Sequence, residues 1–456
     1  MAKDSSSLQS LDIRMPPQDE VEEFSLWWNP ALRESPPKSA ELFLQDKQRD
    51  DGAEGLWRVH DSLYDLSSFV ENHPGGSEWL RLTKGTDVTE AFESHHVTTA
   101  ASHMLAHFYV RPATTERNSP YTFRENGFYK TIQKRAREAL AGVPRGPTFS
   151  SALIADMLAL SIVVFSVLAA VNCSYSVGAL AGLLVALNVV TAHNFLHQKD
   201  NFRMYYFNLS FMSFRDWRVG HAMSHHLFPN SLLDLDISMF APLFQFLPDP
   251  SKTWWGRYGP WIYSPLVYSF MFHGHMFLRL WPVVKGNIGN LHMDDAVPLV
   301  IPFSMMVCAG VGAADAFWMW MWITVTSSLF FHIIAFNGAH HHPEIFHEGD
   351  APRADRDWGL AQLDTVRERP AVNSSLFAAL TNFGYHGLHH LFPAVDHSRL
   401  PLIYPALQKT CEEFGVSFAE YSLLEMYKGQ FQQIARNKPN PIPPGQVIVE
   451  KITHHT

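Results

Sequence analysis

The chain has 456 residues, more than a single domain usually holds, so we expect at least two folded units. Its residues are 46% hydrophobic and 13% aromatic, with a mean hydropathy of -0.08, which fits a partly soluble and partly membrane-embedded chain. The net charge of -9 argues against a nucleic-acid partner, and three widely spaced cysteines fit neither a disulfide framework nor a zinc pattern.

The N-terminal third divides into an arm, a small domain and a linker. Residues 1–45 are rich in Ser, Pro and acidic residues and predict a flexible arm. They do not show the charged stretch followed by an apolar stretch that is typical of a cleaved signal peptide, so we expect none. Residues 46–111 alternate short strand-like and helix-like runs, which indicates a small α+β soluble domain. A polar, basic linker spans 112–149, and residues 431–456 form a C-terminal tail.

Four apolar runs follow, at 152–171, 177–192, 296–314 and 316–335. Each approaches the roughly 20 residues that a helix needs to cross a bilayer, so four transmembrane helices are predicted. Only "NCSYS" separates the first two, which predicts a tight helical hairpin. The apolar stretch 261–281 is interrupted by Pro265 and a histidine pair, so we interpret it as an interfacial or re-entrant helix, with a fifth span as the alternative.

Loop charge predicts the topology. The stretch from Arg111 to Arg145 carries eight basic residues against three acidic ones, whereas the short loops "NCSYS" and "DA" carry no Lys or Arg. The positive-inside rule therefore places both termini in the cytosol. All the histidine clusters then lie on that same side.

Two histidine sites in the small domain predict a haem. "HPGG" begins at His73 with a turn that lets the backbone approach a flat ligand, and the pair His95-His96 follows. Two imidazoles from opposite walls of an apolar pocket suit a six-coordinate haem iron that transfers electrons. The segment "VHDSLYDLSSFVENHPGG" resembles the cytochrome b5 domain. The resemblance implies His73 and His96 as the axial ligands of one haem b, with His95 as the rival to His96.

Four histidine clusters accompany the apolar runs. They are "HNFLH", "HAMSHH", "NGAHHH" and "HGLHH", which begin at residues 193, 221, 337 and 386. On a helix, residues three or four apart share a face, so each cluster directs two or three imidazoles into one volume. Eight or nine neutral nitrogens that meet at a membrane surface can hold two iron ions.

This pattern resembles the membrane fatty-acid desaturases, and a cytochrome b5 domain ahead of three histidine boxes is similar to the front-end acyl desaturases. "PNSLLDLDISM" after the second box and "DWGLAQL" before the third belong to the same resemblance. It implies ligands to two non-haem irons at His193, His197, His221, His225, His226, His386, His389 and His390. It also implies His341 as a further ligand, with His340 as the rival, and Asn337 as the holder of an iron-bound water.

Two positions depart from the family pattern. Asn194 stands where an aspartate is usual, which weakens the expected orientation of His193 or His197. His386 opens the third box where front-end enzymes typically have glutamine. Single histidines elsewhere have simpler interpretations, with His332 as a satisfied core residue and His273 and His275 at the membrane interface.

The expected fold is therefore a cytochrome b5-like α+β haem domain followed by an all-α membrane desaturase domain at 150–430. The resemblance implies O2-dependent di-iron desaturation of a fatty-acyl chain in the endoplasmic reticulum membrane, with electrons supplied by an NAD(P)H-cytochrome b5 reductase through the fused haem. A lipid hydroxylase with the same di-iron centre is one alternative. A membrane-anchored haem electron carrier with an inactive desaturase scaffold is the other.

Overall fold

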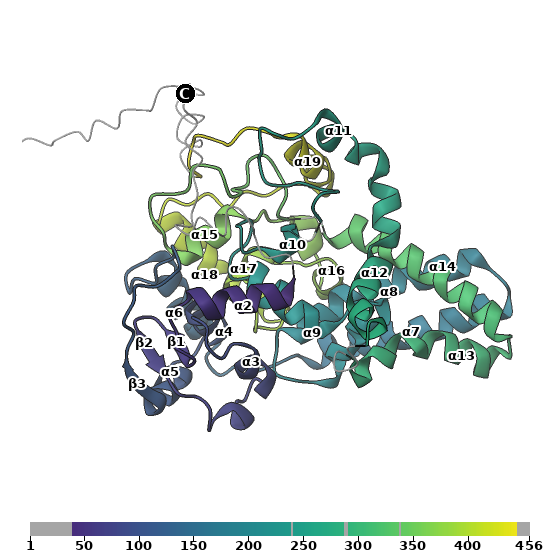
Figure 1. Cartoon of the computed structure of the whole chain (residues 1–456), viewed down its shortest axis with the longest axis horizontal. Helices are drawn as coiled ribbons and strands as arrows, with labels where there is room; N and C mark the ends of the chain where they lie inside the picture. The colour runs from purple at the N-terminus through teal and green to yellow at the C-terminus, as the bar shows by residue number, and fades with distance from the viewer. Residues whose placement is uncertain (1–38, 239, 287–290, 337–338, 445–456) are drawn as a thin grey trace, which may run out of the picture.

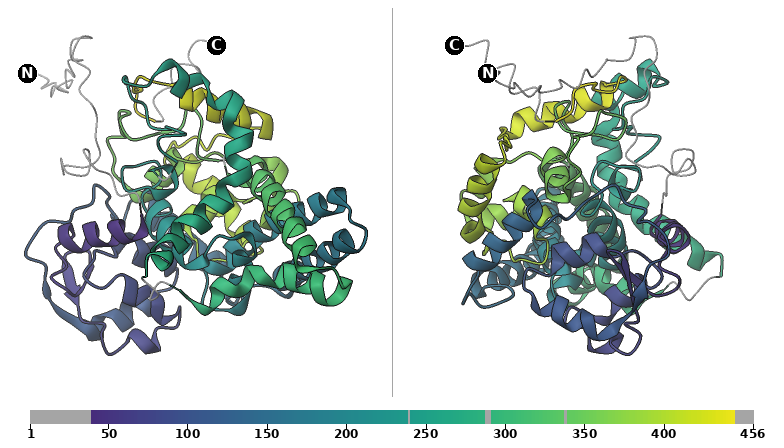
Figure 2. Two further views of the ribbon diagram at one scale, coloured as in Figure 1. Left: turned by 45° about the vertical axis from the view of Figure 1, so that its right-hand side comes forward. Right: turned by 90° about the vertical axis from the view of Figure 1, so that its left-hand side faces the viewer.

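The computed structural model describes residues 39–238, 240–286, 291–336 and 339–444. Figure 1 shows a small N-terminal domain beside a larger helical body, from which a bundle of helices projects on the opposite side. The views in Figure 2 show the same arrangement, with the small domain packed directly against the body.

The small domain is built on a three-stranded antiparallel sheet in the order β1 (Trp57–Val59), β2 (Ser62–Tyr64) and β3 (Tyr109–Pro112). His60 has a φ of 54° in the two-residue turn that joins the first two strands. Four helices surround the sheet: α2 (Ala40–Asp50), α3 (Ser77–Leu82), α4 (Thr89–His95) and α5 (Ala100–Leu105). The alternating pattern of the sequence thus corresponds to a small α+β domain, and α2 begins inside the stretch expected as an arm.

The linker between the domains contains a packed helix, α6 (Phe128–Ala139). Its buried face, which includes Phe128, Tyr129 and Ile132, packs against α15 (Trp358–Asp364) and α18 (Leu400–Glu413). Apolar residues recur here at helical spacing among the basic ones, so the linker adds to the core of the helical body.

Three helices in the described residues are long and apolar enough to cross a membrane, judged by length and composition: α7 (Phe149–Val171), α8 (Tyr175–Leu196) and the segment Ala313–Ile334, which contains α14 (Ala313–Phe331). Thr148 and Ser174 cap the first two with side-chain hydrogen bonds to the backbone. Large apolar side chains of α7, such as Leu160, are exposed, as expected for a surface that contacts lipid.

The predicted span at 296–314 corresponds to a 3-10 helix, η6 (Met293–Leu299), and a short helix, α13 (Val300–Ala309). Pro298 lies inside η6, and Gly310 ends α13 with a left-handed φ of 65°. Four transmembrane helices therefore stay a prediction. The apolar stretch 261–281 lies in α12 (Pro260–Val284), which runs across the bundle helices in Figure 1.

The remaining elements complete the body around the buried core. They are η3 (Phe202–Ser210), α9 (Phe214–Trp217), η4 (Arg218–His225), α10 (Leu235–Ser238), α11 (Trp254–Tyr258), η7 (His332–Phe336), η8 (Pro370–Asn373), α16 (Leu376–Thr381), α17 (His386–Leu391) and α19 (Leu423–Ala435). One hydrophobic core joins the bundle to η3 and α9, and a second joins α6, α15, α17 and α18.

Candidate functional site

The first two histidine boxes are placed by the end of α8 and by a π-helix. His193 lies in the last turn of α8, and His197 follows directly after its end. Residues 218–225 form η4, where the His226 N–H donates to the His221 carbonyl at 2.8 Å, five residues back. A single π-helical turn of this kind re-aims side chains and often lies at a functional site. Here it directs the second box toward the first.

The third box forms the short helix α17, which starts after Tyr385 in a left-handed conformation with a φ of 50°. The Gly387 N–H donates to the buried Glu368 carboxylate at 2.9 Å. A side chain at Gly387 would collide with the ring of Phe418, so the close packing behind this box requires glycine.

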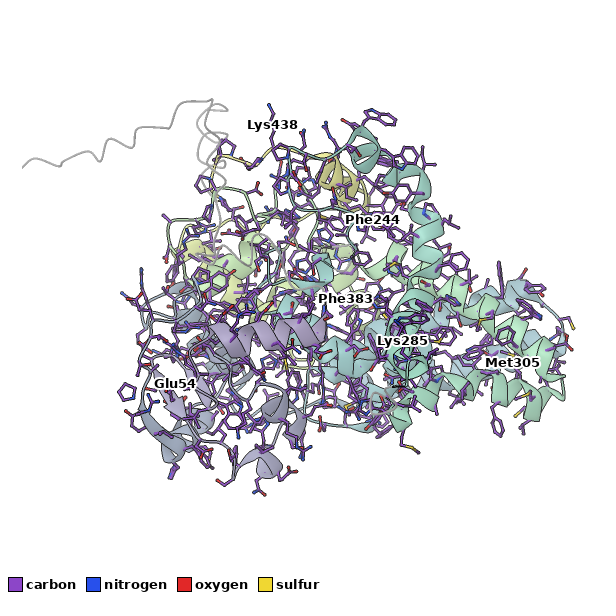
Figure 3. All side chains as sticks on the ribbon, viewed as in Figure 1. Glu54, Phe244, Lys285, Met305, Phe383 and Lys438 are labelled. Atoms are coloured by element: carbon purple, nitrogen blue, oxygen red, sulfur yellow. The ribbon has the colours of Figure 1, made fainter. Side chains whose placement is uncertain are left out.

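Five buried imidazoles from these boxes form one set, which we call set A: His193, His197, His221, His226 and His389. One nitrogen from each lies within 4.8 Å of all the others. The Nε2 atom of His193 is 2.8 Å from that of His221 and 2.9 Å from that of His197. The ring of Phe383, labelled near the middle of Figure 3, packs 4.6 Å from His193 and closes one side.

A second group, set B, consists of His225, His340, His386 and His390. The Nε2 atom of His340 lies 3.1 Å from that of His225 and 2.7 Å from that of His386. His226 and His390 stack with ring centroids 4.2 Å apart, so the two sets are neighbours.

The structure brings His340, and not His341, into set B. The ring of His341 instead stacks on Phe246 at 3.6 Å, and its Nδ1 atom lies 3.5 Å from His347. His341 was expected because it lies four residues after Asn337 and would share its helical face. Residue 340 lies in a turn, so that spacing does not apply. Asn337 lies outside the described residues.

Four outer partners orient the imidazoles. Nδ1 of His221 lies 2.6 Å from Asp236, and Nδ1 of His225 lies 2.9 Å from Asp234. The Nδ1 atoms of His340 and His390 face the Thr365 carbonyl and the Gln362 amide oxygen at 2.9 and 3.0 Å. Each acceptor holds its histidine as the Nδ1–H tautomer and leaves Nε2 free for a metal.

Sequence reasoning did not assign these outer partners. Asp234 and Asp236 belong to "DLD" and Gln362 to "DWGLAQL", both quoted above only for their resemblance. The signal that could have found the two aspartates is their position. They lie two residues apart, shortly after the second box, and they orient two histidines, His221 and His225, that lie close together in η4.

Burial and mutual repulsion keep most of these imidazoles neutral. Burial and the neighbouring His340 and His386 hold the pKa of His390 well below its usual range, and the pKa of His389 is lowered in the same way. At His225 burial lowers the pKa, but Asp234 and Asp236 outweigh it and raise the value. Neutral imidazole is the form that binds metal, so the sets are prepared as ligands.

The donor set fits a metal that imidazole binds. The Nε2 atoms of His193, His221 and His389 crowd together, with His193 2.8 Å from His221 and 3.3 Å from His389, and the Nε2 atom of His390 is buried without a hydrogen-bond partner. Imidazoles that crowd nitrogen against nitrogen are costly unless a cation lies between them. Imidazole ligands suit iron as well as copper and nickel, whereas four-coordinate zinc would leave several donors unused.

Asn194, the departure noted in the first box, has a defined role. Its Nδ2 donates to the buried Asp396 carboxylate at 2.8 Å, and its Oδ1 accepts from Nδ1 of His397 at 2.8 Å. Ser151 and Gln198 also donate to Asp396. An amide is needed here, because an aspartate would face a second carboxylate. His193 and His197 are therefore not oriented by this side chain.

Asn194→Asp is expected to destabilise the protein by about 3 kcal/mol, because a second buried carboxylate would repel Asp396, and the cost of charging the buried His397 beside it would limit the compensation. Asn194→Ala is the control, since it removes the same hydrogen bonds, adds no charge and is expected to cost about 1–2 kcal/mol. Thermal unfolding of the two variants in one detergent measures the difference. Equal unfolding temperatures would contradict the role given to the amide.

The predicted haem ligands face each other. The rings of His73 and His96 lie 6.3 Å apart between centroids, and each Nδ1 is hydrogen-bonded to a carbonyl, that of Gly76 or of Phe92. Two metal–imidazole bonds of about 2 Å each, together with the ring radii, span a distance of this size. His95 points elsewhere, with its ring 5.6 Å from Trp79.

The surroundings of this pair also fit a haem. Trp57, Val59, Leu66 and Leu105 form the apolar core behind it. Phe69 and Phe92 flank the pair, with ring centroids 6.0 Å from His73 and 4.9 Å from His96. Apolar rings beside two facing imidazoles suit a flat, largely apolar ligand.

Two family models match the chain. Residues 171–422 match the family model described as fatty acid desaturase, and residues 43–113 match the cytochrome b5-like heme/steroid binding domain. No solved structure matches the chain.

Curated relatives cover nearly the whole chain. A cytochrome b5-related protein of Drosophila melanogaster is 42% identical over 91% of this chain and 96% of its own length. A probable Delta(5) fatty acid desaturase C of Dictyostelium discoideum is 25% identical over 80% of this chain and 87% of its own. An acyl-lipid (8-3)-desaturase of Mortierella alpina is 24% identical over 79% and 88%. The chain belongs to the fatty acid desaturase family and carries a cytochrome b5-like domain ahead of its desaturase domain.

Proposed function

We propose that the protein desaturates a fatty-acyl chain in an O2-dependent reaction at a di-iron centre, with electrons delivered through the haem of its own N-terminal domain. The observation that carries this proposal is the meeting of sets A and B in one buried volume, with His226 and His390 stacked at 4.2 Å. Two irons bound there would supply the activation of dioxygen that removal of hydrogen from an unactivated methylene requires.

The proposed ligand assignment follows the two sets. Set A would hold one iron and set B the other, with His340 in the place expected for His341. His73 and His96 would hold the haem, which leaves no open position on its iron and so favours electron transfer.

The protein's own groups prepare and protect this centre. Asp234, Asp236 and Gln362 fix imidazole tautomers through the hydrogen bonds given above. Phe383 and Trp217, whose rings lie 4.6 Å from His193 and His221, shield set A from water. A dry site limits side reactions of reactive oxygen species.

The proposed location is the endoplasmic reticulum membrane, with multiple spans, and with both termini and the metal sites in the cytosol. The basic stretch before α7 and the exposed apolar faces of α7 and α12 support this placement. An NAD(P)H-cytochrome b5 reductase is the proposed electron donor, and a fatty-acyl lipid or thioester is the proposed substrate.

Product analysis tests the proposal. Purified protein with haem and iron, given a reductase, NADH, O2 and a panel of acyl-CoA and phospholipid substrates, should form acyl chains lighter by two hydrogens, as detected by mass spectrometry. Products heavier by one oxygen would identify a hydroxylase instead. Haem reduction without any lipid product, in protein that contains non-haem iron, would indicate an inactive scaffold.

His340→Ala is expected to weaken non-haem iron binding about tenfold or more, because loss of one orienting partner alone costs that much and a direct ligand costs at least as much. His341→Ala is the matched control, since both residues are buried and adjacent in the chain. Iron per haem, measured after dialysis against a weak chelator, separates the two. Iron loss in the His341 variant with retention in the His340 variant would restore the assignment made from sequence.

A further inference from the structure

The small domain is joined to the helical body by a group of ionic and aromatic contacts that we call the docking contact: Glu78, Trp79, Asp200, Arg215 and Arg218. Glu78 and Trp79 lie in α3, five and six residues beyond His73, while Arg218 opens η4, the helix of the second box. The docking contact therefore joins α3, which follows the proposed haem ligand His73, to η4, which carries proposed iron ligands.

Arg218 is the centre of this contact. Its side chain is 1% exposed, and its guanidinium bonds Glu78 at 2.7 Å and Asp200 at 2.6 Å. Nε donates to the Leu196 carbonyl at 3.3 Å, and the guanidinium lies 4.9 Å over the Trp79 ring. A buried guanidinium that loses one carboxylate is left partly uncompensated, which is costly. The undocked state is thus disfavoured.

The backbone of the haem-binding turn also contacts the first box. The Asp200 N–H donates to the Gly75 carbonyl at 3.3 Å. Gly76 has a φ of 118°, and a side chain there would overlap the Asp200 carboxylate. Gly75 lies two residues after His73, and Asp200 lies three residues after His197. This hydrogen bond therefore links the backbone segments that carry the proposed haem ligand His73 and the proposed iron ligand His197.

His95 lies between the two sites. It adjoins His96 in sequence, and its ring packs against Trp79 of the docking contact. Trp79 in turn packs against the hydrophobic core that contains Trp217 and Phe383, the two rings beside set A.

The other side of the haem domain is held as well. The Glu93 carbonyl of α4 accepts hydrogen bonds from Tyr129 at 2.8 Å and Gln133 at 2.9 Å, and its carboxylate pairs with Lys130 at 2.6 Å, all from α6. The domain is therefore clamped on both sides of its ligand pair and is not merely tethered by a flexible linker.

We propose that the docking contact holds the His73 turn against the first histidine box as a fixed electron-transfer interface, with His95 and Trp79 packed between the haem and set A. This proposal rests on the proposed function. Each transfer moves one electron, so that haem iron passes from Fe²⁺ to Fe³⁺ while one non-haem iron passes from Fe³⁺ to Fe²⁺. A fixed contact removes the search that a diffusing donor requires.

Charge reversal at Glu78 tests the proposal in the full-length protein loaded with haem and ferric iron. Glu78→Lys should open the docking contact, because it sets an ammonium against Arg215 and Arg218. Glu71→Lys is the matched control, since Glu71 pairs with Arg81 inside the haem domain and both side chains are exposed. Glu78→Gln is a milder variant should the reversal impair folding.

Two measurements are made on each variant. Hydrogen exchange reports opening directly, and segments 73–82 and 196–204 should exchange faster in the Glu78 variants and not in the control. Anaerobic flash reduction of the haem by a flavin photoreductant, followed at the haem absorbance bands, gives the rate at which the electron leaves the haem. That rate should fall about tenfold or more in Glu78→Lys and become dependent on viscosity, because misplacement of a reacting pair has effects of this size.

The outcomes separate this proposal from the proposed function. Faster exchange together with slower, viscosity-dependent electron transfer supports the interface. Either change without the other, or the same changes in Glu71→Lys, overturns it even if the protein makes a desaturated product. A wild-type haem that never passes its electron to non-haem iron would overturn the proposed function itself.

Discussion

Replacing His389 and His390 together with alanine should remove both non-haem irons and lower turnover at least about a thousandfold, because the metal supplies the whole reaction. His389 belongs to set A and His390 to set B, so this one double substitution takes a nitrogen from each set. The haem should remain, since neither residue contacts the His73–His96 pair. Iron assayed against haem in detergent-purified protein should fall from about three irons per haem to about one.

His347→Ala is the control for this double variant, because His347 is fully buried and belongs to neither set. It should keep its non-haem iron despite the small cavity that the substitution leaves. Carefully prepared wild-type protein that contains haem iron alone would contradict the di-iron proposal, and the enzyme would then need another route to oxygen chemistry.

The sequence predicts most of the histidines that lie together in the structure, because histidines three or four residues apart on a helix point to the same side. His193 and His197 lie four residues apart at the end of α8, and His386, His389 and His390 share α17, so a rule of three or four residues is enough. The second box needed more than this rule, since its π-turn directs His221 and His226 to set A and His225 to set B, which spacing alone does not reveal.

The sequence gives too little information in two situations: where regular structure breaks locally, and where a partner lies far away in the chain. The choice between His340 and His341 depended on continuing a helix from Asn337, but residue 340 lies in a turn. The predicted span at 296–314 is interrupted by Pro298 and ended by Gly310. The role of Asn194 depends on Asp396, about two hundred residues away, and a pattern read within one box does not include such a partner.

The same limit applies to the docking contact. Its carboxylates and guanidiniums come from stretches 78, 200 and 215–218, and each is unremarkable in its own segment. Charged residues at such positions usually lie on a solvated surface, so only tertiary packing identifies Arg218 as buried. The ligand assignments, by contrast, stay predictions until metal is measured.

His73→Ala should abolish haem binding and, with it, reductase-driven turnover, while non-haem iron stays at two per chain. The expected loss of NADH-dependent product is at least about a hundredfold, since the haem is the proposed route for every electron and unassisted delivery to a buried centre is slow. Purified protein should lack the haem absorbance bands, and iron assays should still detect the di-iron pair. Loss of both metals would instead indicate that the fold of the helical body depends on the haem domain.

His95→Leu completes this experiment by separating the two candidates for the second haem ligand. His96 faces His73 with ring centroids 6.3 Å apart, whereas the His95 ring packs on Trp79, so His95→Leu should retain a bis-histidine haem spectrum and His96→Leu should not. If the docking contact works as proposed, His95→Leu should also keep its haem but pass electrons more slowly to set A. A variant that loses haem at His95 and keeps it at His96 would reverse the ligand assignment and remove His95 from the proposed path.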